Sequence, residues 1–171
     1  MDKEELINQM YSGLMVYSKY VAFWGSAFSN FFPCNFVYDG VEWNCSEQCF
    51  MAMKAKHFND EEIYAKILDA KTPKEAKKLG REVKNFDDTE WSKVRFNYMY
   101  EIVKEKFKQN DYLLEFLKND DFKDKKFVEG SPIDGIWGVK IDYRNDSVND
   151  ERFWKGENLL GKVLDKVREE L

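Results

Sequence analysis

The stretch from Phe36 to Lys56, FVYDGVEWNCSEQCFMAMKAK, combines both kinds of element from which the fold is built. Its first half predicts a hairpin, because Asp39-Gly40 is a favoured pair for a two-residue turn in which both residues need positive φ. In the second half, Ser46 is a typical N-cap, and Glu47 falls in the first turn of a helix that ends near Lys56. The stretch therefore predicts a hairpin followed by a helix.

Outward from this stretch, helices outweigh strands. Further helices are expected in five places: Asn59–Ala70 (a capping box of Asn59 and Glu62), Thr72–Gly80 (cap Thr72, Pro73, Glu75), residues 90–108, residues 111–118, and a C-terminal helix with the apolar stripe Leu160, Val163, Leu164, Val167 and Leu171. A loose helix is expected over residues 1–15, and extended segments over residues 17–23, 126–128 and 136–139. Because the strands are few and do not alternate with helices, the fold class is mainly α with a few short β-strands or hairpins (α+β), in a single compact domain.

Composition excludes several classes of protein. The 171 residues are 43% hydrophobic and 16% aromatic, which is enough for a core and excludes a disordered chain. No apolar run approaches the length of a membrane span, and the acidic N-terminus does not resemble a signal peptide. Three cysteines, an odd number, favour a reducing cytoplasm over a disulfide framework. We expect no metal site, since Cys34, Cys45 and Cys49 are best interpreted as buried small hydrophobes and His57 is the only histidine.

The charge pattern has one local exception. The net charge of -5 opposes general binding to phosphate-rich partners. Between Lys66 and Lys84, however, the sequence contains seven basic residues and three acidic ones, which gives a local charge of +4. Four of the basic residues, Lys74, Lys77, Lys78 and Arg81, have the spacing of one helical face. That face is either a solvated helix surface or a surface that binds a phosphate-bearing substrate.

The helix after the hairpin carries the first candidate for chemistry. Glu47 and Lys54 are seven residues apart, two turns along the same face. A carboxylate and an amine placed in this way could line one pocket, where burial would lower the pKa of the lysine and make it a nucleophile. The alternative is an exposed surface pair.

A second candidate is the loop from Phe127 to Gly138. Glu129 and Asp134 could serve acid–base roles there, and Trp137 could stack on a base or sugar. The alternative is a turn-forming aspartate beside a core tryptophan. Two further segments could contribute to a pocket. Phe23–Pro33 is either an aromatic wall with polar contacts or a core plug with a polar turn. In Trp154–Gly161, Asn158 either caps a helix or lies beside amides that hold an anion.

At these places the sequence resembles the NADAR (YbiA-like) family of N-glycosidases, from about Phe23 to Leu171. The likeness rests on the following residues, in order: Phe28-Ser29-Asn30-Phe31, Pro33, Phe36, Asp39-Gly40, Cys45-Ser46-Glu47-Gln48, Met51, Lys54-Ala55, Lys77-Lys78-Leu79-Gly80-Arg81, Trp91, Arg95-Phe96, Lys106-Phe107, Gln109-Asn110, Glu129, Ser131-Pro132, Asp134, Ile136-Trp137-Gly138, Trp154-Lys155-Gly156, Asn158-Leu159-Leu160-Gly161 and Val167-Arg168. Two departures are Phe28, where leucine is common, and Val139-Lys140 after Gly138, where Ile-Gly is common. The likeness makes residues 21–171 the family's domain and residues 1–20 an N-terminal extension.

The resemblance implies cleavage of the bond between ribose C1′ and a base, without a cofactor. One substrate class is ADP-ribose on guanine, in single-stranded DNA, where a cognate ADP-ribosyltransferase toxin would be a partner through chemistry rather than contact. The alternatives are a phosphorylated ribosylaminouracil intermediate of riboflavin biosynthesis, or a noncatalytic ADP-ribose-binding module. The implied catalytic residues are Glu47, Lys54, Glu129 and Asp134. The implied substrate-binding residues are Phe23, Trp24, Ser29, Asn30, Phe31, Arg81, Trp137, Gly138, Asn158, Leu160 and Gly161.

Two mechanisms stay open at this point. In the preferred one, Lys54 captures C1′ as a Schiff base while Glu47 moves protons. In the other, Glu47 or Glu129 activates water, Asp134 acts at the sugar hydroxyls and Lys54 only binds phosphate. In both, Trp24 and Trp137 would enclose a base, and Arg81 would meet phosphate.

Overall fold

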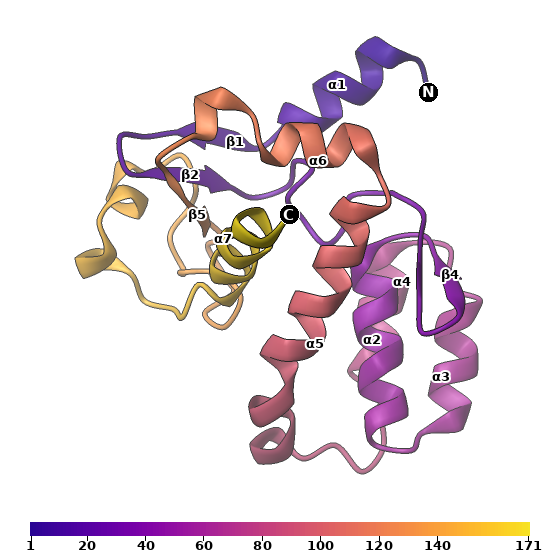
Figure 1. The fold of residues 1–171 in the computed structure, drawn as a ribbon. Coiled ribbons are helices and arrows are strands. Elements are labelled where there is room, and N and C mark those ends of the chain that lie inside the picture. Colours follow the sequence, from indigo (N-terminus) through magenta and orange to yellow (C-terminus); the bar gives the residue numbers. More distant parts are fainter. The chain divides into compact units, whose positions relative to one another are not determined.

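Helices make up most of the secondary structure in a computed structural model that describes residues 1–171 (Figure 1). The helices are α1 (Lys3–Tyr11), α2 (Ser46–His57), α3 (Glu61–Leu68), α4 (Pro73–Gly80), α5 (Asp88–Lys108), α6 (Asp111–Leu117) and α7 (Leu159–Glu170). The strands are β1 (Leu14–Val16), β2 (Tyr20–Phe23), β3 (Phe36–Tyr38), β4 (Val41–Trp43) and β5 (Lys126–Glu129). The predicted class, mainly α with a few short strands, is therefore confirmed.

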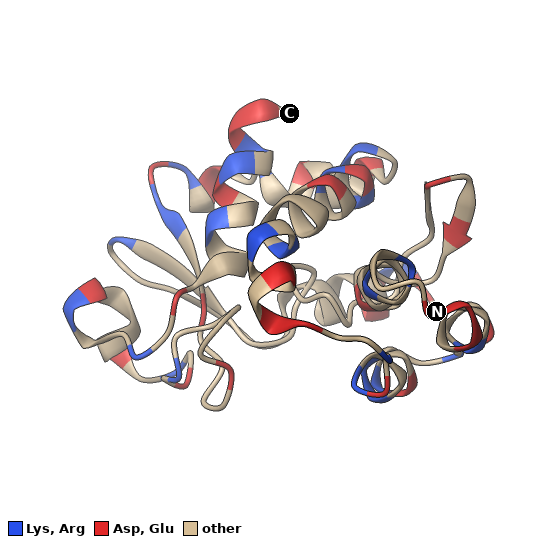
Figure 2. Cartoon of the chain, turned by 90° about the horizontal axis from the view of Figure 1, so that it is seen from below, with Lys and Arg blue, Asp and Glu red and all other residues tan.

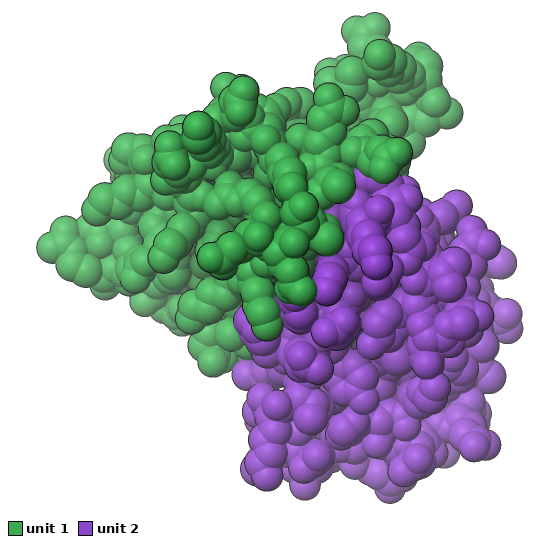
Figure 3. Space-filling view, viewed as in Figure 1, with its two compact units in different colours: residues 1–29, 111–171 green, residues 30–110 purple.

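The chain divides into two compact units, which are coloured separately in Figure 3. Unit 1 combines residues 1–29 with residues 111–171, and unit 2 is the continuous segment 30–110. Unit 1 is thus built from both ends of the chain, whereas unit 2 is a single insertion between them. Each unit is described in turn.

Unit 1 is built around a three-stranded sheet with the order β1-β2-β5. β1 and β2 are antiparallel, whereas β2 and β5 are parallel, with Tyr20 opposite Lys126 and Phe23 opposite Glu129. All four residues of β2 are buried, and α7 packs on β5. Aromatic rings complete the core, since Phe28 contacts Phe23, Phe116, Phe122 and Phe127.

Two expectations for unit 1 need correction. The extended segment expected over residues 17–23 is shorter, because the strand begins at Tyr20 and pairs with β1, which was not predicted. Residues 136–139 do not form a strand, because the Asp134 carboxylate accepts hydrogen bonds from the amides of Ile136 and Trp137 and so bends the chain into a turn. The stripe of α7 is as predicted, with four of its five members buried and only Leu171 partly exposed.

Unit 2 begins with the predicted hairpin, in which Phe36 lies opposite Trp43. Asp39 and Gly40 have φ values of 53° and 73°, so both turn residues adopt the left-handed conformation that the sequence predicts. The helix α2 is central to the unit, because it packs against α3, α4 and α5 and buries nine of its twelve residues. This burial on nearly all sides explains why the helix has no strong apolar stripe.

The starts of two helices in unit 2 differ from the prediction. Cys45, not Ser46, caps α2, since its Sγ accepts the amide of Gln48 at 3.4 Å. Asp60, not Asn59, caps α3, since its carboxylate accepts the amides of Ile63 and Lys84. Asn59 instead adopts φ 57° directly after α2, a conformation that ends a helix.

Of the other two helices of unit 2, α4 starts as predicted and α5 starts slightly earlier. Thr72 caps α4 through its bond from the amide of Glu75, as predicted. The long helix α5 begins at Asp88, two residues before its expected start, because the side chain of Asp87 caps it.

Candidate active site

In unit 2, α2 places Glu47 and Lys54 on the same face. Glu47 lies in the first turn and is only 8% exposed, and its amide donates to the carbonyl of Asn30 at 3.0 Å. Lys54 lies in the last turn and is half-buried. The negative charge of Glu47 favours the protonated form of Lys54, so the two groups are electrostatically coupled. Neither side chain points freely into bulk water, as an exposed surface pair would.

The ammonium of Lys54 has two further contacts within unit 2. Its Nζ donates to the carbonyl oxygen of Gly80 at 2.8 Å and lies 4.4 Å from the centre of the Phe86 ring. The Gly80 carbonyl can come this close because α4 ends against α2, where an added Cβ on Gly80 would collide with the side chain of Met51. Lys54 is therefore held by the end of the neighbouring helix.

Burial has the largest effect on the protonation of Lys54 and lowers its pKa below the ordinary value for lysine. The positive charge of Arg81 acts in the same direction, whereas Glu47 and Asp88 oppose it. The balance leaves an amine that loses its proton more readily than an exposed lysine does. An amine of this kind is suited to nucleophilic attack on an electrophilic carbon.

Arg81 and Phe31 line a pocket of about 600 Å³ along α4. Phe31 is 40% exposed, and the Nζ of Lys77 lies 5.7 Å from the centre of its ring. The neighbouring Asn30 is buried, and its Oδ1 has no hydrogen-bond partner. Unit 2 thus brings together five of the predicted residues: Asn30, Phe31, Glu47, Lys54 and Arg81.

In unit 1, Asn158 connects the predicted residues of the second set. Its Oδ1 accepts the amide of Glu129 at 2.9 Å, and its Nδ2 donates to the carbonyl of Phe127 at 3.0 Å. Its own amide donates to the carbonyl of Gly138 at 3.2 Å. Asn158 has φ 53° and forms no side-chain cap to α7, so the interpretation of this residue as a helix cap was wrong. The side chain of Asn158 thus joins the start of α7 to β5, and its backbone amide joins the same point to the loop that follows β5.

The two glycines of the second set allow close packing around Asn158. A Cβ on Gly161 would collide with the carbonyl of Phe127 and with the amide of Asn158. A Cβ on Gly138 would lie 2.9 Å from the carbonyl oxygen of Glu129. Leu160 is fully buried, and its amide donates to the carbonyl of Trp137 at 3.1 Å, so it supports the loop from within the core.

Asp134 uses one carboxylate oxygen to shape its loop. That oxygen accepts the amides of Ile136 and Trp137 at 2.8 and 2.9 Å. The amide of Asp134 in turn donates to the Oγ of Ser131 at 3.0 Å. These bonds match the alternative of a turn-forming aspartate, and they leave the second carboxylate oxygen of Asp134 outside the turn. Trp137 is half-buried rather than a core residue.

The remaining predicted residues belong to the segment that follows β2. Phe23 is fully buried, and its ring packs 5.6 Å from that of Phe28, so its side chain belongs to the core. Trp24 is exposed, and Ser29 is half-buried. The predicted site residues therefore fall into two sets, one in each unit.

Sequence reasoning missed two groups that contact Lys54, the carbonyl of Gly80 and the ring of Phe86. A backbone carbonyl carries no sequence signal. The only available signal for Gly80 was its predicted position at a helix end, where it allows close packing. Phe86 lies in the short connection between α4 and α5, where no periodic pattern singles it out.

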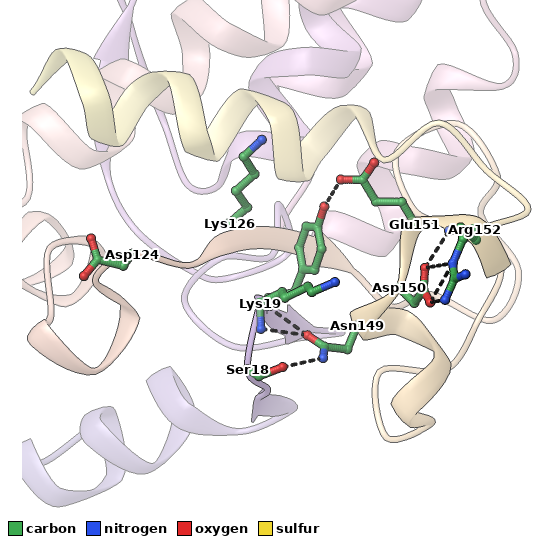
Figure 4. A pocket seen from close by; sticks show the side chains of 9 residues that line it. Ser18, Lys19, Asp124, Lys126, Asn149, Asp150, Glu151 and Arg152 are labelled. Atoms are coloured by element: carbon green, nitrogen blue, oxygen red, sulfur yellow. Dashed lines mark hydrogen bonds and ion pairs between the residues drawn. The ribbon is translucent and has the colours of Figure 1, made fainter.

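A pocket of about 550 Å³ in unit 1 contains none of the predicted residues (Figure 4). Its polar groups bond to one another: Asn149 joins Ser18 to the backbone of Lys19, and Arg152 pairs with Asp150 at 2.6 Å. The hydroxyl of Tyr20 donates to Glu151, and burial followed by this bond raises the pKa of Tyr20. These mutual bonds are typical of a structural network, and this pocket is not a candidate for the chemistry.

The cysteines and the histidine lie in apolar surroundings. Cys34, Cys45 and Cys49 are buried and free, and burial raises the pKa of Cys45 to about 11. His57 packs among aromatic rings, with its Nδ1 3.0 Å from the hydroxyl of Tyr98. No group of three or more metal-binding side chains occurs, and no helix is long and apolar enough to cross a membrane.

Comparison with known proteins supports the resemblance seen in the sequence. The NADAR domain family matches residues 20–171. N-glycosidase R617 of Acanthamoeba polyphaga mimivirus is 38% identical over 165 residues, which cover 89% of this chain and 96% of the relative. Riboflavin biosynthesis protein VVA0006 of Vibrio vulnificus is 34% identical over 143 residues, which cover 84% of this chain but only 35% of the relative. The NMR structure of the Escherichia coli protein YbiA aligns with a TM-score of 0.71 at 26% identity, over 95% of this chain and 90% of that one. The chain belongs to the NADAR domain family.

Proposed function

We propose that this protein is an N-glycosidase that removes ADP-ribose from ADP-ribosylated guanine in DNA. The observation that carries the proposal is the environment of Lys54, a half-buried amine with a lowered pKa that shares a helix face with a buried carboxylate. The name of the 38% identical relative R617 supports the class of reaction, cleavage of an N-glycosyl bond. The cation of Arg81 at the end of α4 supports a substrate that carries phosphate.

Cleavage of the C1′–N bond builds positive charge on the sugar, while the base leaves with a proton. In our proposal the C1′–O4′ bond of the sugar opens, and the neutral amine of Lys54 bonds to C1′ while one of its protons passes to O4′. The C1′–N bond to the base then breaks, and C1′ and Lys54 stay joined as a protonated imine. Glu47 carries the proton that the base takes, and it later receives one from water. One water molecule then hydrolyses the imine, which frees ADP-ribose and restores the amine of Lys54.

Other predicted residues receive supporting roles in the proposal. The cation of Arg81 meets a phosphate of the substrate. The roles that the resemblance implies for Glu129, Asp134, Trp24 and Trp137 at the sugar and the base stay predictions, because these residues belong to unit 1. A transferase that attaches ADP-ribose to guanine would supply the substrate through its chemistry, without binding this protein.

A second candidate substrate is a phosphorylated ribosylaminouracil intermediate of riboflavin biosynthesis. The relative VVA0006 is named for that process, and the cation of Arg81 would bind the single phosphate of such an intermediate. The two substrates share the C1′–N bond, so the proposed roles of Glu47 and Lys54 apply to both. They differ in the number of phosphates and in the adenosine group, which only the first contains.

The deciding experiment is a product assay that offers an ADP-ribosylguanine oligonucleotide and the ribosylaminouracil phosphate side by side. We expect release of free ADP-ribose and unmodified guanine, detected by mass spectrometry. Binding without release at high protein concentration would instead identify a noncatalytic ADP-ribose-binding module. Faster cleavage of the second substrate would identify the riboflavin-type activity.

The covalent step has its own test. Borohydride added during turnover should reduce the imine and leave a mass adduct on Lys54. The Glu47→Gln variant should be slower by about 10²- to 10⁴-fold, the range for a general acid or base. If no adduct forms and the Lys54→Ala variant stays active, direct attack of water replaces the covalent mechanism.

A further inference from the structure

A second binding region lies along α4 in unit 2. Seven residues line it, and we call it the α4 groove: Phe31, Thr72, Lys74, Glu75, Lys77, Lys78 and Arg81. The groove has a volume of about 600 Å³ and combines side chains from the helix with the ring of Phe31. Only Phe31 and Arg81 belong to the predicted site, so most of the groove has no role in the proposed reaction.

The groove carries a net positive charge. It contains four cations and one carboxylate, a net charge of +3, on a chain whose total is -5. The carboxylate belongs to Glu75, which accepts the amide of Lys71 and so serves the start of α4. Figure 2 shows that Lys and Arg (blue) and Asp and Glu (red) are mixed over the chain as a whole.

The row of cations is longer than one diphosphate requires. From Lys74 to Arg81 it extends over two helical turns, a distance of about 10 Å at about 1.5 Å per residue. A diphosphate occupies two or three cations at a single point. A row of cations along a helix instead matches a chain of phosphates, which an acidic surface elsewhere would repel.

The exposed ring of Phe31 is a second, independent feature of the groove. Exposed aromatic rings beside cations are the usual means by which proteins bind single-stranded nucleic acid, since bases stack on the ring and cations follow the backbone. The ring is 40% exposed and lies beside Lys77.

The groove also adjoins the candidate site within unit 2. Phe31 follows Asn30, whose carbonyl accepts the amide of Glu47. Arg81 follows Gly80, whose carbonyl accepts the ammonium of Lys54. A strand lying in the groove would thus pass next to residues that contact both reactive groups.

We propose that the α4 groove binds the single DNA strand that flanks the modified guanine, with one base stacked on Phe31 and the phosphates held by Lys74, Lys77 and Lys78. The inference rests on the proposed function for the identity of the strand. The binding itself can be measured without modified DNA, so the two can fail separately.

The test measures the binding of an unmodified single-stranded 12-mer by fluorescence anisotropy over a series of salt concentrations. The Lys74→Gln/Lys78→Gln double variant should bind more weakly and should lower the salt slope by about 1.4, at about 0.7 per lost phosphate contact. Phe31→Leu should weaken binding about 5- to 150-fold with an unchanged slope, the range for one stacked base. The matched control, Lys93→Gln/Lys108→Gln, removes two exposed lysines of α5 outside the groove and should bind like the wild type.

An activity measurement then separates the two proposals. The Lys74→Gln/Lys78→Gln variant should lose kcat/KM on an ADP-ribosylated oligonucleotide but keep it on ADP-ribosylated guanosine, which has no flanking strand. Equal losses on both substrates, or a wild-type protein that does not bind the 12-mer, would overturn the groove proposal. So would loss of ADP-ribose binding by Phe31→Leu to the same extent as loss of strand binding, because the ring would then hold the adenosine of the substrate. If neither substrate is cleaved while the groove variants still lose the 12-mer, the proposed function fails and strand binding stands.

Discussion

Two regions of the molecule carry the candidate chemistry, and they are built in opposite ways. In α2 the backbone between Glu47 and Lys54 is held by the bonds of the helix itself, and the two side chains project from one face. In the loop after β5 the carboxylate of Asp134 accepts two backbone amides of the loop, and the side chain of Asn158 bonds to the backbone of β5. The side chains of Glu47 and Lys54 are therefore not required to hold the backbone of their own element, whereas those of Asp134 and Asn158 hold the backbone around them.

Substitutions in the two regions should therefore have different effects on the rate and on the free energy of unfolding. A change at Lys54 should reduce the rate with little effect on the free energy of unfolding. A change at Asn158 should reduce the free energy of unfolding first, and the rate only as a result. Four measurements address this difference, beginning with the largest effect.

Replacement of Lys54 by alanine should lower kcat by at least about 10³-fold, because it removes the proposed nucleophile. The melting temperature should change little, since the side chain is only half-buried. Lys56→Ala is the matched control, because it removes an exposed lysine of the same helix that pairs with Asp39 at 2.5 Å. A Lys54→Ala variant as fast as the Lys56→Ala control would remove the distinction between the two regions.

Replacement of Asn158 by alanine should lower the free energy of unfolding by about 2–4 kcal/mol. Two hydrogen bonds of a buried side chain are lost, and the amide of Glu129 and the carbonyl of Phe127 lose their partner. Asn158→Gly separates these bonds from the backbone effect, because glycine tolerates the φ of 53° at this position. Urea titration measures both variants, and a wild-type midpoint for either one would contradict the assigned role.

The pH dependence of the rate should follow the amine of Lys54. Because burial lowers its pKa, the neutral form accumulates at a lower pH than for an exposed lysine, and kcat should rise with pH to an early plateau. Between the lowered pKa and the ordinary one, the unfolded chain binds the extra proton, so the free energy of unfolding also rises with pH in that interval. Arg81→Gln removes a charge that lowers this pKa, so the rising part of the profile should move to higher pH. A shift to lower pH would show that a different group titrates.

The smallest effect is expected for Asp134→Asn. The amide oxygen of asparagine still accepts the amides of Ile136 and Trp137, so only the charge of the acceptor is lost, at a cost of about 0.5–1.5 kcal/mol. The rate should fall by no more than about tenfold, the equivalent of 1.4 kcal/mol in one contact to the sugar. Asp134→Ala, which removes both hydrogen bonds of the turn, should lower the free energy of unfolding and the rate by more than Asp134→Asn does. A loss of about 10² or more in Asp134→Asn would give this residue a catalytic role like that of Glu47.

Local signals in the sequence predicted the elements of unit 2 well. The Asp39-Gly40 turn, the Thr72 cap and the long helix α5 each depend on residues close in sequence, and all three were predicted. The same spacing argument placed Glu47 and Lys54 on one face of α2. The errors at Cys45 and Asp60 are shifts of one residue, where neighbouring polar residues compete for a cap.

The rest of the structure depends on contacts between distant residues. The parallel pairing of β2 with β5 joins Tyr20 to Lys126, and no local pattern specifies such a pair. The bond from Lys54 to the carbonyl of Gly80 depends on how α4 packs against α2. The interpretation of Asn158 as a helix cap was wrong for the same reason, because the partners of its side chain at Phe127 and Glu129 are about thirty residues away.

The order of the two units along the chain has a consequence for biosynthesis. Unit 2 is continuous, and Gln109 near its end bonds to Val37 near its start. The side-chain oxygen of Gln109 accepts the amide of Val37, and its side-chain nitrogen donates to the carbonyl of Val37. Unit 2 can therefore fold on the ribosome as soon as residue 110 has emerged, since domains fold as units during translation. The sheet of the other unit must wait for β5, so β2 leaves the exit tunnel about a hundred residues before its parallel neighbour does. During that interval its four apolar residues are exposed, which makes this strand the point at which a nascent chain would most need a chaperone.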